Sequence, residues 1–258
     1  MKKLALLLAA MLLCTAFVGC AEKNENVIIY GTSVDYAPYE FHTIIDGKDT
    51  IVGYDVSLAK YIAKELDKEI EIKDIGFDYL IQELKNGTID MVIAAMEENP
   101  ERAKEADFSD PYYLDEPPMI LVRKADADKY KELSAFKDKT VGAQAATTKE
   151  DLVKNDMEGA KLLSLTTVPD LINQLLFNKC DAVVLDAAVA RQYAETNKDL
   201  VIAEAALGVA APYRVAVKKG DPKGLLPGIN AAIAKAKEAG LLDSWMTDAV
   251  KLSESAAN

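Results

Sequence analysis

Apolar residues alternate along the chain between short continuous runs and helical spacings. Short apolar runs bounded by polar residues or glycine predict buried strands. The expected strands cover 26–32, 69–73, 89–96, 119–122, 141–143, 162–165, 182–185 and 213–217. Between two of them, Leu58, Ile62 and Leu66 follow one another at i, i+4 and i+8, which is one face of a helix. The alternation predicts an α/β protein whose parallel sheets are covered by helices on both faces.

The same kind of spacing predicts the remaining helices. They cover 54–67, 78–85, 148–155, 169–177 and 186–196, and further helices follow 217 up to about 250. No Gly-x-Gly-x-x-Gly or phosphate-loop pattern comes after any expected strand. The sequence therefore gives no support for nucleotide binding.

The N-terminal stretch is expected to direct the chain to the cell envelope rather than to fold. Lys2 and Lys3 precede an uncharged stretch whose continuous apolar core is only Leu4–Leu13. A basic start, a short apolar core and small residues are typical of a secretory signal peptide. The alternative is a membrane anchor, because the 18 uncharged residues of 4–21 lie at the lower edge of spanning length.

The stretch ends in Phe17-Val18-Gly19-Cys20, which resembles the lipobox of bacterial lipoproteins. The resemblance implies a signal peptide over 1–19 and an acylated Cys20, with palmitate among the expected acyl chains. Residues 20–26 would then be a lipidated polar tether. The resemblance implies a lipid-anchored protein of the bacterial cell envelope, facing the periplasm or the extracellular side.

Charge and composition narrow the function further. The chain has 258 residues with 42 acidic and 30 basic side chains, a net charge of −12 that argues against nucleic-acid binding. The single histidine, His42, excludes a multi-histidine metal site, and no metal or cofactor is expected. If Cys14 leaves with the signal and Cys20 is acylated, Cys180 is the only thiol. It is expected to be a buried or half-buried structural residue.

Five motifs occur in a fixed order along the chain. They are 36–41 (YAPYEF), 52–59 (VGYDVSLA), 77–91, 100–113 (which contains PER and DFSDPYY) and 180–186 (CDAVVLD). In this order and spacing they resemble the periplasmic amino-acid-binding proteins of ATP-binding-cassette (ABC) importers, which are family 3 solute-binding proteins. The resemblance runs from about Val27 to the region of Trp245.

The resemblance implies a type II periplasmic-binding-protein fold, in which two α/β lobes are joined by two crossings and close on a ligand. Lobe 1 would consist of 27–114 and 213–258, and lobe 2 of 118–207. The hinge crossings would lie at 114–118 and 207–213, where prolines and a glycine interrupt regular stretches.

The resemblance also implies how a zwitterionic amino acid would be held. Arg102 would bind the ligand carboxylate, helped by Thr147, Thr148 and backbone amides at a helix N-terminus. Asp186 would accept the ligand ammonium. Each has a structural alternative. Arg102 would otherwise form a surface pair with Glu98 or Glu105, and Thr148 and Asp186 would otherwise be helix N-caps.

Other matched positions bear on the side chain of the ligand. Tyr36 and Phe77 would enclose it between aromatic rings, with ordinary core packing as the alternative. Ser33 stands where relatives that prefer cationic ligands have an acidic residue, which argues against lysine or arginine. Ala94 and Ala95 offer only backbone groups.

Glu97 stands where the family generally has serine or threonine. Its carboxylate is expected either to pair with Arg102 or with the ligand ammonium, or to point into solvent.

These observations favour a solute-binding lipoprotein that captures an amino acid or related zwitterion and delivers it to the permease subunits of an importer. A monomer without enzymatic activity is expected. One alternative is an enzyme similar to cyclohexadienyl dehydratase, with Glu97 as general acid. Another is a sensor or adhesin that uses the same fold without transport.

Overall fold

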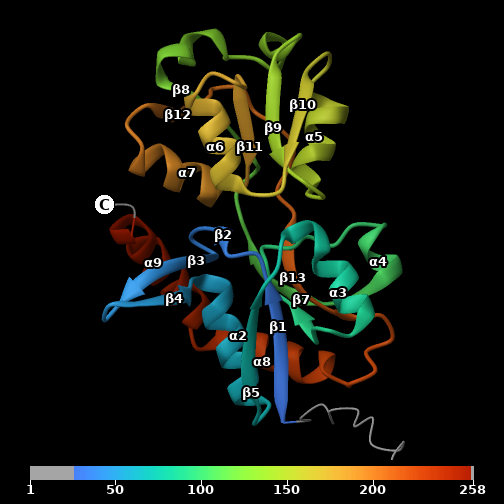
Figure 1. Cartoon of the computed structure of the whole chain (residues 1–258). Coiled ribbons are helices and arrows are strands. Elements are labelled where there is room, and N and C mark those ends of the chain that lie inside the picture. Colours follow the sequence, from blue (N-terminus) through green and yellow to red (C-terminus); the bar gives the residue numbers. More distant parts are fainter. Residues whose placement is uncertain (1–25, 257–258) are drawn as a thin grey trace, which may run out of the picture.

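The computed structural model describes residues 26–256 and divides them between two α/β lobes. Figure 1 shows one lobe above the other, and the chain passes between them twice. The two-lobed α/β fold expected from the sequence is therefore confirmed. The expected signal peptide and Cys20 lie outside the described residues, as does the tether up to residue 25.

The first lobe is built on a sheet of order β5-β1-β6-β13-β7. Its strands are β1 (Val27–Thr32), β5 (Glu69–Asp74), β6 (Met91–Val92), β7 (Ala106–Leu114) and β13 (Pro212–Lys218). Its helices are α2 (Tyr54–Glu65), η1 (Phe77–Tyr79), α3 (Leu80–Asn86), α4 (Arg102–Glu105), α8 (Leu226–Glu238) and α9 (Leu241–Ala256). Leu58 and Ile62 on the predicted face of α2 are fully buried, which confirms its apolar side.

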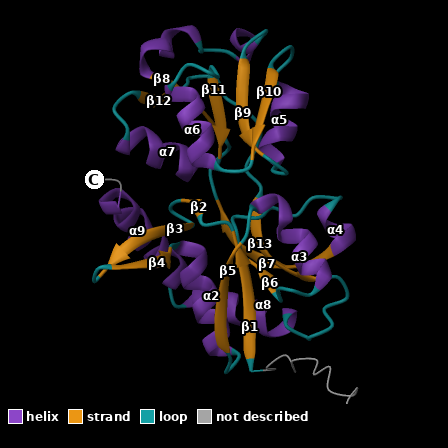
Figure 2. Ribbon diagram, in the orientation of Figure 1, coloured by secondary structure: helices purple, strands orange, loops and turns teal. Residues whose placement is uncertain are grey.

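The second lobe has a sheet of order β10-β9-β11-β8-β12. Its strands are β8 (Met119–Arg123), β9 (Thr140–Gln144), β10 (Lys161–Leu165), β11 (Ala182–Leu185) and β12 (Leu200–Ile202). Its helices are η2 (Lys124–Lys129), η3 (Leu133–Phe136), α5 (Thr148–Asp156), α6 (Val168–Leu176) and α7 (Ala187–Thr196). Figure 2 shows how these helices flank the strands. Cys180 precedes β11, is buried as expected, and burial raises the pKa of its thiol to about 11.

A small third sheet in the first lobe is absent from the sequence prediction. It consists of β2 (Asp35–Tyr36), β3 (Glu40–Ile45) and β4 (Lys48–Val52), paired antiparallel. Asp46 and Gly47 form the turn between β3 and β4, both with positive φ. Asp-Gly is a favoured sequence for such two-residue turns. The sheet places Asp35, Tyr36 and Glu40 beside one another.

Two expectations about strands are wrong. The sheets are mixed rather than parallel, because β13 runs antiparallel to β6 and β7, and β8 antiparallel to β11 and β12. The expected strand 89–96 shrinks to Met91–Val92. Beyond it the chain turns at Ala95, whose φ is 44° and whose N–H donates to Asp55 Oδ2 at 2.6 Å. The apolar run continues because these residues are buried, although they are no longer in a strand.

No helix within residues 26–256 is long and apolar enough to cross a membrane.

Gly53 fixes the start of α2 against the loop that precedes β3. Its φ is 133°, and an added Cβ would lie 2.1 Å from the carbonyl oxygen of Tyr39. Gly53→Ala should therefore reduce the free energy of unfolding by about 2–4 kcal/mol, through a backbone clash and an unfavourable φ. The measurement is urea unfolding followed by circular dichroism. Gly47→Ala is the control, because φ is positive (+76°) but nothing lies within 4 Å. An equal loss in both variants would contradict the clash.

Candidate functional site

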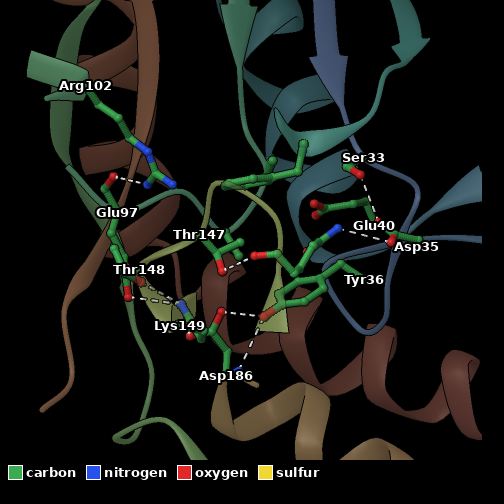
Figure 3. Close-up of a pocket in the computed structure, with 14 residues that line it drawn as sticks. Ser33, Asp35, Tyr36, Glu40, Glu97, Arg102, Thr147, Thr148, Lys149 and Asp186 are labelled. Carbon is green, nitrogen blue, oxygen red and sulfur yellow. Dashed lines mark hydrogen bonds and ion pairs between the residues drawn. The ribbon is translucent and has the colours of Figure 1, made fainter. Parts of the chain in front are cut away.

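A pocket lies between the two lobes, and all nine residues predicted from the sequence line it. The lobe 1 residues are Ser33, Asp35, Tyr36, Glu40, Phe77, Ala94, Ala95, Glu97 and Arg102, and the lobe 2 residues are Gln144, Thr147, Thr148, Lys149 and Asp186. Figure 3 shows their side chains converging from both lobes. Five lining residues are additional to these nine: Asp35, Glu40, Ala94, Gln144 and Lys149.

Arg102 begins α4 and is buried rather than exposed on a helix surface. Its Nη1 donates to the carbonyl of Glu97 at 2.6 Å, and its Nη2 donates to the carbonyl of Ala146 in the other lobe at 2.9 Å. Its guanidinium lies over the ring of Phe77, 5.2 Å from the centroid. The surface-pair alternative is therefore wrong. Burial lowers the pKa of Arg102 from its usual value.

Asp186 follows β11 and occupies the N-cap position just before α7, but its side chain makes no capping hydrogen bond. Instead Oδ2 accepts from the hydroxyl of Tyr36 at 2.6 Å, and Oδ1 lies 2.5 Å from Nζ of Lys149. Burial and the neighbouring Asp186 raise the pKa of Tyr36 well above its usual value, so its hydroxyl stays a donor. Asp186 therefore occupies the N-cap position that the alternative expected, but its carboxylate does not cap the helix and is directed into the pocket.

Thr148 is the first residue of α5, and the residue before it, Thr147, occupies the N-cap position. The Thr147 hydroxyl donates to the carbonyl of Gln144 at 2.6 Å, and neither threonine caps the helix. The Thr148 hydroxyl donates to the carboxylate of Glu97 across the pocket. Thr148 therefore lines the pocket as predicted, but its hydrogen bond to Glu97 was not predicted from the sequence.

Glu97 is paired, although not with the residue expected. Its Oε1 lies 3.2 Å from Nζ of Lys149, and both side chains are less than a tenth exposed. Lys149 therefore bridges Glu97 and Asp186. Burial acts to lower the pKa of Lys149, but the charges of Asp186 and Glu97 outweigh it, and the pKa is raised. The expectation that Glu97 points into solvent is wrong.

The opposite side of the pocket is acidic. Asp35 Oδ2 accepts from the N–H of Val168 at 2.8 Å and from Nε2 of Gln144 at 3.2 Å, while Ser33 donates to Oδ1 at 2.8 Å. Glu40 is fully buried, and neither of its carboxyl oxygens has a hydrogen-bond partner of normal geometry. Figure 3 shows Ser33, Asp35 and Glu40 together, across the pocket from Glu97 and Lys149.

Burial raises the pKa values of these two carboxyls. For Asp35 the hydrogen bonds it accepts act in the opposite direction, but the pKa remains raised. For Glu40 the charge of the neighbouring Asp55 adds to burial, and the pKa lies well above its usual value. A buried carboxyl without a donor is costly when ionised. A cationic group placed here would relieve that cost.

The contacts described above join the lobes directly. Tyr36, Asp35, Glu97 and Arg102 of the first lobe each contact a residue of the second. The space left in the pocket is about 10 Å³, which is roughly the room that one water molecule needs. A ligand of amino-acid size therefore enters only when the lobes separate.

Among residues 26–256, no group of three or more histidine, cysteine, aspartate or glutamate side chains is placed to hold a metal ion.

The chain is similar to known proteins over most of its length. The profile of the bacterial extracellular solute-binding proteins, family 3, matches residues 28–248. The arginine-binding extracellular protein ArtP of Bacillus subtilis is 36% identical over 208 residues, which cover 78% of this chain and 79% of ArtP. The ABC transporter arginine-binding protein 1 of Escherichia coli is 31% identical over 259 residues, covering 95% and 99% of the two chains.

Solved structures agree with the sequence comparisons. An amino acid ABC transporter substrate-binding protein, AbpA from Streptococcus pneumoniae, bound to L-arginine, superposes with a TM-score of 0.85 at 35% identity. The match covers 89% of this chain and 96% of that one.

The buried pair Glu40 and Asp55 should make stability depend on pH. Burial raises the pKa of both carboxyls, so the folded protein holds protons that the unfolded chain releases near pH 4. Their contribution to stability is present below that pH and is lost as the pH rises through the raised folded-state pKa values. Asp55→Asn supplies an N–H beside Glu40, and should flatten the decline in stability between pH 4 and neutral.

The measurement is the free energy of urea unfolding at several pH values, expressed as the difference between wild type and variant. The matched control is Asp128→Asn, because the Asp128 side chain is fully exposed. If the free energy of unfolding changes with pH in the same way in wild type and in Asp55→Asn, the raised pKa values of Glu40 and Asp55 are not the source of the pH dependence.

Proposed function

The chain belongs to the bacterial extracellular solute-binding proteins of family 3, and from this membership we propose that it binds an amino acid with a cationic side chain, of the arginine class, and delivers it to an ABC importer. The similar arginine-binding proteins of Bacillus subtilis and Escherichia coli and the L-arginine-bound protein of Streptococcus pneumoniae support this ligand class. The acidic side of the pocket supports it independently.

The observation that favours a cationic side chain is the presence of two carboxyls, Asp35 and Glu40, on one side of the pocket. Both carboxyls line the pocket, and Glu40 is fully buried without a hydrogen-bond partner of normal geometry. A guanidinium offers five N–H donors in a planar fork that matches carboxylate geometry. Ser33 is neutral, but its hydroxyl donates to Asp35, so negative charge is present beside this position. Ser33 therefore does not count against arginine as the ligand.

The other side of the pocket suits the α-groups of the ligand. Arg102 would bind the α-carboxylate, with Thr147 and Thr148 beside it, and the α-ammonium would have to share the carboxylate of Asp186 with Lys149. The rings of Tyr36 and Phe77 and the backbone at Ala95 would enclose the ligand between these two ends. Arg102 and Asp186 belong to different lobes, so only the closed protein engages both. Binding would therefore stabilise closure.

Closure requires the segments between the lobes to act as a hinge. We place these hinges at 114–118 and 207–213. Leu114 and Val209 are both more than half exposed, at 61% and 81%. Neither side chain is packed firmly between the lobes, which is compatible with a change of lobe orientation. The lobes on either side would move as rigid bodies over 27–114 with 213–258, and over 118–207.

No enzymatic role is proposed. The dehydratase alternative needs Glu97 to donate a proton, but Glu97 is held by an ammonium and a hydroxyl donor. Both contacts suit an ionised carboxylate. The family consists of solute-binding proteins, and this also favours binding over catalysis. The sensor or adhesin alternative would use the same pocket without permease subunits as partners.

The binding site can be tested with L-arginine, L-lysine and neutral amino acids. In isothermal titration the purified mature protein should bind L-arginine, and Glu40→Gln should weaken binding by about 10- to 100-fold, because a charged contact of roughly 1.5–3 kcal/mol is lost. Arg102→Ala should abolish measurable binding. Glu204→Gln, at a side chain that is 73% exposed, is the control and should leave affinity unchanged. Equal binding of neutral amino acids would contradict the proposal.

We also propose that the protein is a monomer held at the envelope surface through acylated Cys20. Expressed in a bacterial host fed an alkyne-tagged palmitate analogue, the wild type should incorporate the label and fractionate with membranes. Cys20→Ser removes the acylated thiol, so the variant should remain unlabelled. Cys14→Ser serves as the control, since that residue lies within the expected signal peptide. Label in Cys20→Ser would rule out this anchor.

A further inference from the structure

Lys149 places a cationic group of the protein itself at the acceptor proposed for the ligand ammonium. Its Nζ is 2.5 Å from Asp186 Oδ1 and 3.2 Å from Glu97 Oε1, and the side chain is 5% exposed. Figure 3 shows it reaching into the pocket between these two carboxylates. Asp186 Oδ2 is occupied as well, by the hydroxyl of Tyr36 at 2.6 Å.

A second ammonium at Asp186 would therefore meet unfavourable conditions. It would have to share a carboxylate whose two oxygens already accept strong hydrogen bonds, and it would lie close to the positive charge of Lys149. Departure of Lys149 would leave the buried carboxylate of Glu97 without its ammonium partner, since the other hydrogen bond to this carboxylate comes from the neutral hydroxyl of Thr148.

The charges on this side of the pocket are already balanced. Arg102 and Lys149 contribute two positive charges, and Glu97 and Asp186 contribute two negative ones. A ligand carboxylate at Arg102 adds a favourable contact, whereas a ligand ammonium at Asp186 replaces one that exists. The α-ammonium thus contributes much less than the carboxylate and the cationic side chain.

We propose that Lys149 is a specificity-determining residue: it substitutes for the ligand α-ammonium, so the pocket selects a carboxylate joined to a distant cationic group and tolerates loss of the α-amino group. Glu97 is the positioning residue that holds Lys149 in place. The inference rests on the proposed preference for arginine-like ligands, and it adds the chemical feature by which the site departs from a general amino-acid site.

The test compares L-arginine with 5-guanidinopentanoate, which is arginine without its α-amino group. Isothermal titration of the mature wild-type protein should give affinities that differ by less than about ten-fold. A desolvated ammonium–carboxylate pair that loses one partner would otherwise cost about thirty-fold or more. In Lys149→Gln, Asp186 becomes available to the ligand, and the preference for L-arginine should rise at least ten-fold.

A second variant protects the test against misfolding. Lys149→Gln combined with Glu97→Ser removes both members of the ion pair, leaves no unpaired Glu97 and should show the same gain in preference. Lys154→Gln, on the same helix but with a half-exposed side chain, is the control and should keep the wild-type ratio.

The outcomes separate this inference from the proposed function. A wild type that binds L-arginine more than ten-fold better than its analogue, or a ratio unchanged in both Lys149 variants, overturns the role of Lys149 and leaves the arginine-class ligand intact. If neither compound binds the wild type, the proposed ligand class is wrong, and the inference that rests on it is wrong as well.

Discussion

Burial of charge between two lobes is the constraint on which the rest of this structure depends. A pocket for a zwitterion needs fixed charges in a place from which water is largely excluded, and an unpaired buried charge is strongly destabilising. In this protein several of the charges that line the pocket find partners across the lobe boundary, although Glu40 does not. Lys149 of the second lobe reaches Glu97 of the first, and Arg102 of the first reaches the carbonyl of Ala146 in the second. Closing the two lobes therefore also brings these buried charges to their partners.

The wall of the pocket in the first lobe is held by a group of packed tyrosines. Tyr39 contacts Tyr54, Tyr113 and Tyr213 edge-on, with ring centroids 5.5–6.2 Å apart. The Tyr39 hydroxyl donates to Asp115 at 2.9 Å, and the same carboxylate oxygen accepts from the N–H of Ala188 in the second lobe at 3.1 Å. Asp115 thus links the tyrosine group to the other lobe at one of the two crossings. Rigid aromatic packing here fixes the strand that presents Tyr36 to the pocket.

Most of the fold could be predicted from hydrophobic periodicity, and the exceptions have physical causes. The helices and the buried strands of the second lobe follow their apolar runs closely. Antiparallel β13 could not be told from a parallel strand, because both are buried on two faces and show the same continuous apolar run. The hairpin β3–β4 has largely exposed residues and lacks that run, although Asp46-Gly47 marks its turn. The Asp-Gly signal was the one available indication.

The site shows a different limit. Motif matching identified nine lining residues, because the family keeps chemistry at fixed places relative to its strands and helices. Motif matching missed Glu40 and Lys149 for two different reasons. Glu40 lies within a matched motif, yet nothing in the motif distinguishes a buried carboxyl from a solvated one. Lys149 stands at a helix start followed by Glu150 and Asp151, a pattern typical of an exposed face.

Glu97 was the residue that departed most from the family pattern, and Lys149 explains the departure. Without Lys149, the buried carboxylate of Glu97 would lose its ammonium partner, so Glu97 depends on Lys149, whereas Lys149 is also paired with Asp186. Two residues that compensate one another, 52 positions apart in sequence, leave no local trace that periodicity or composition could detect. They become visible as one unit only when the lobes are brought together. A residue in a ligand pocket that contradicts its family is therefore informative, since a buried charge requires a partner and that partner stands where the ligand must also bind.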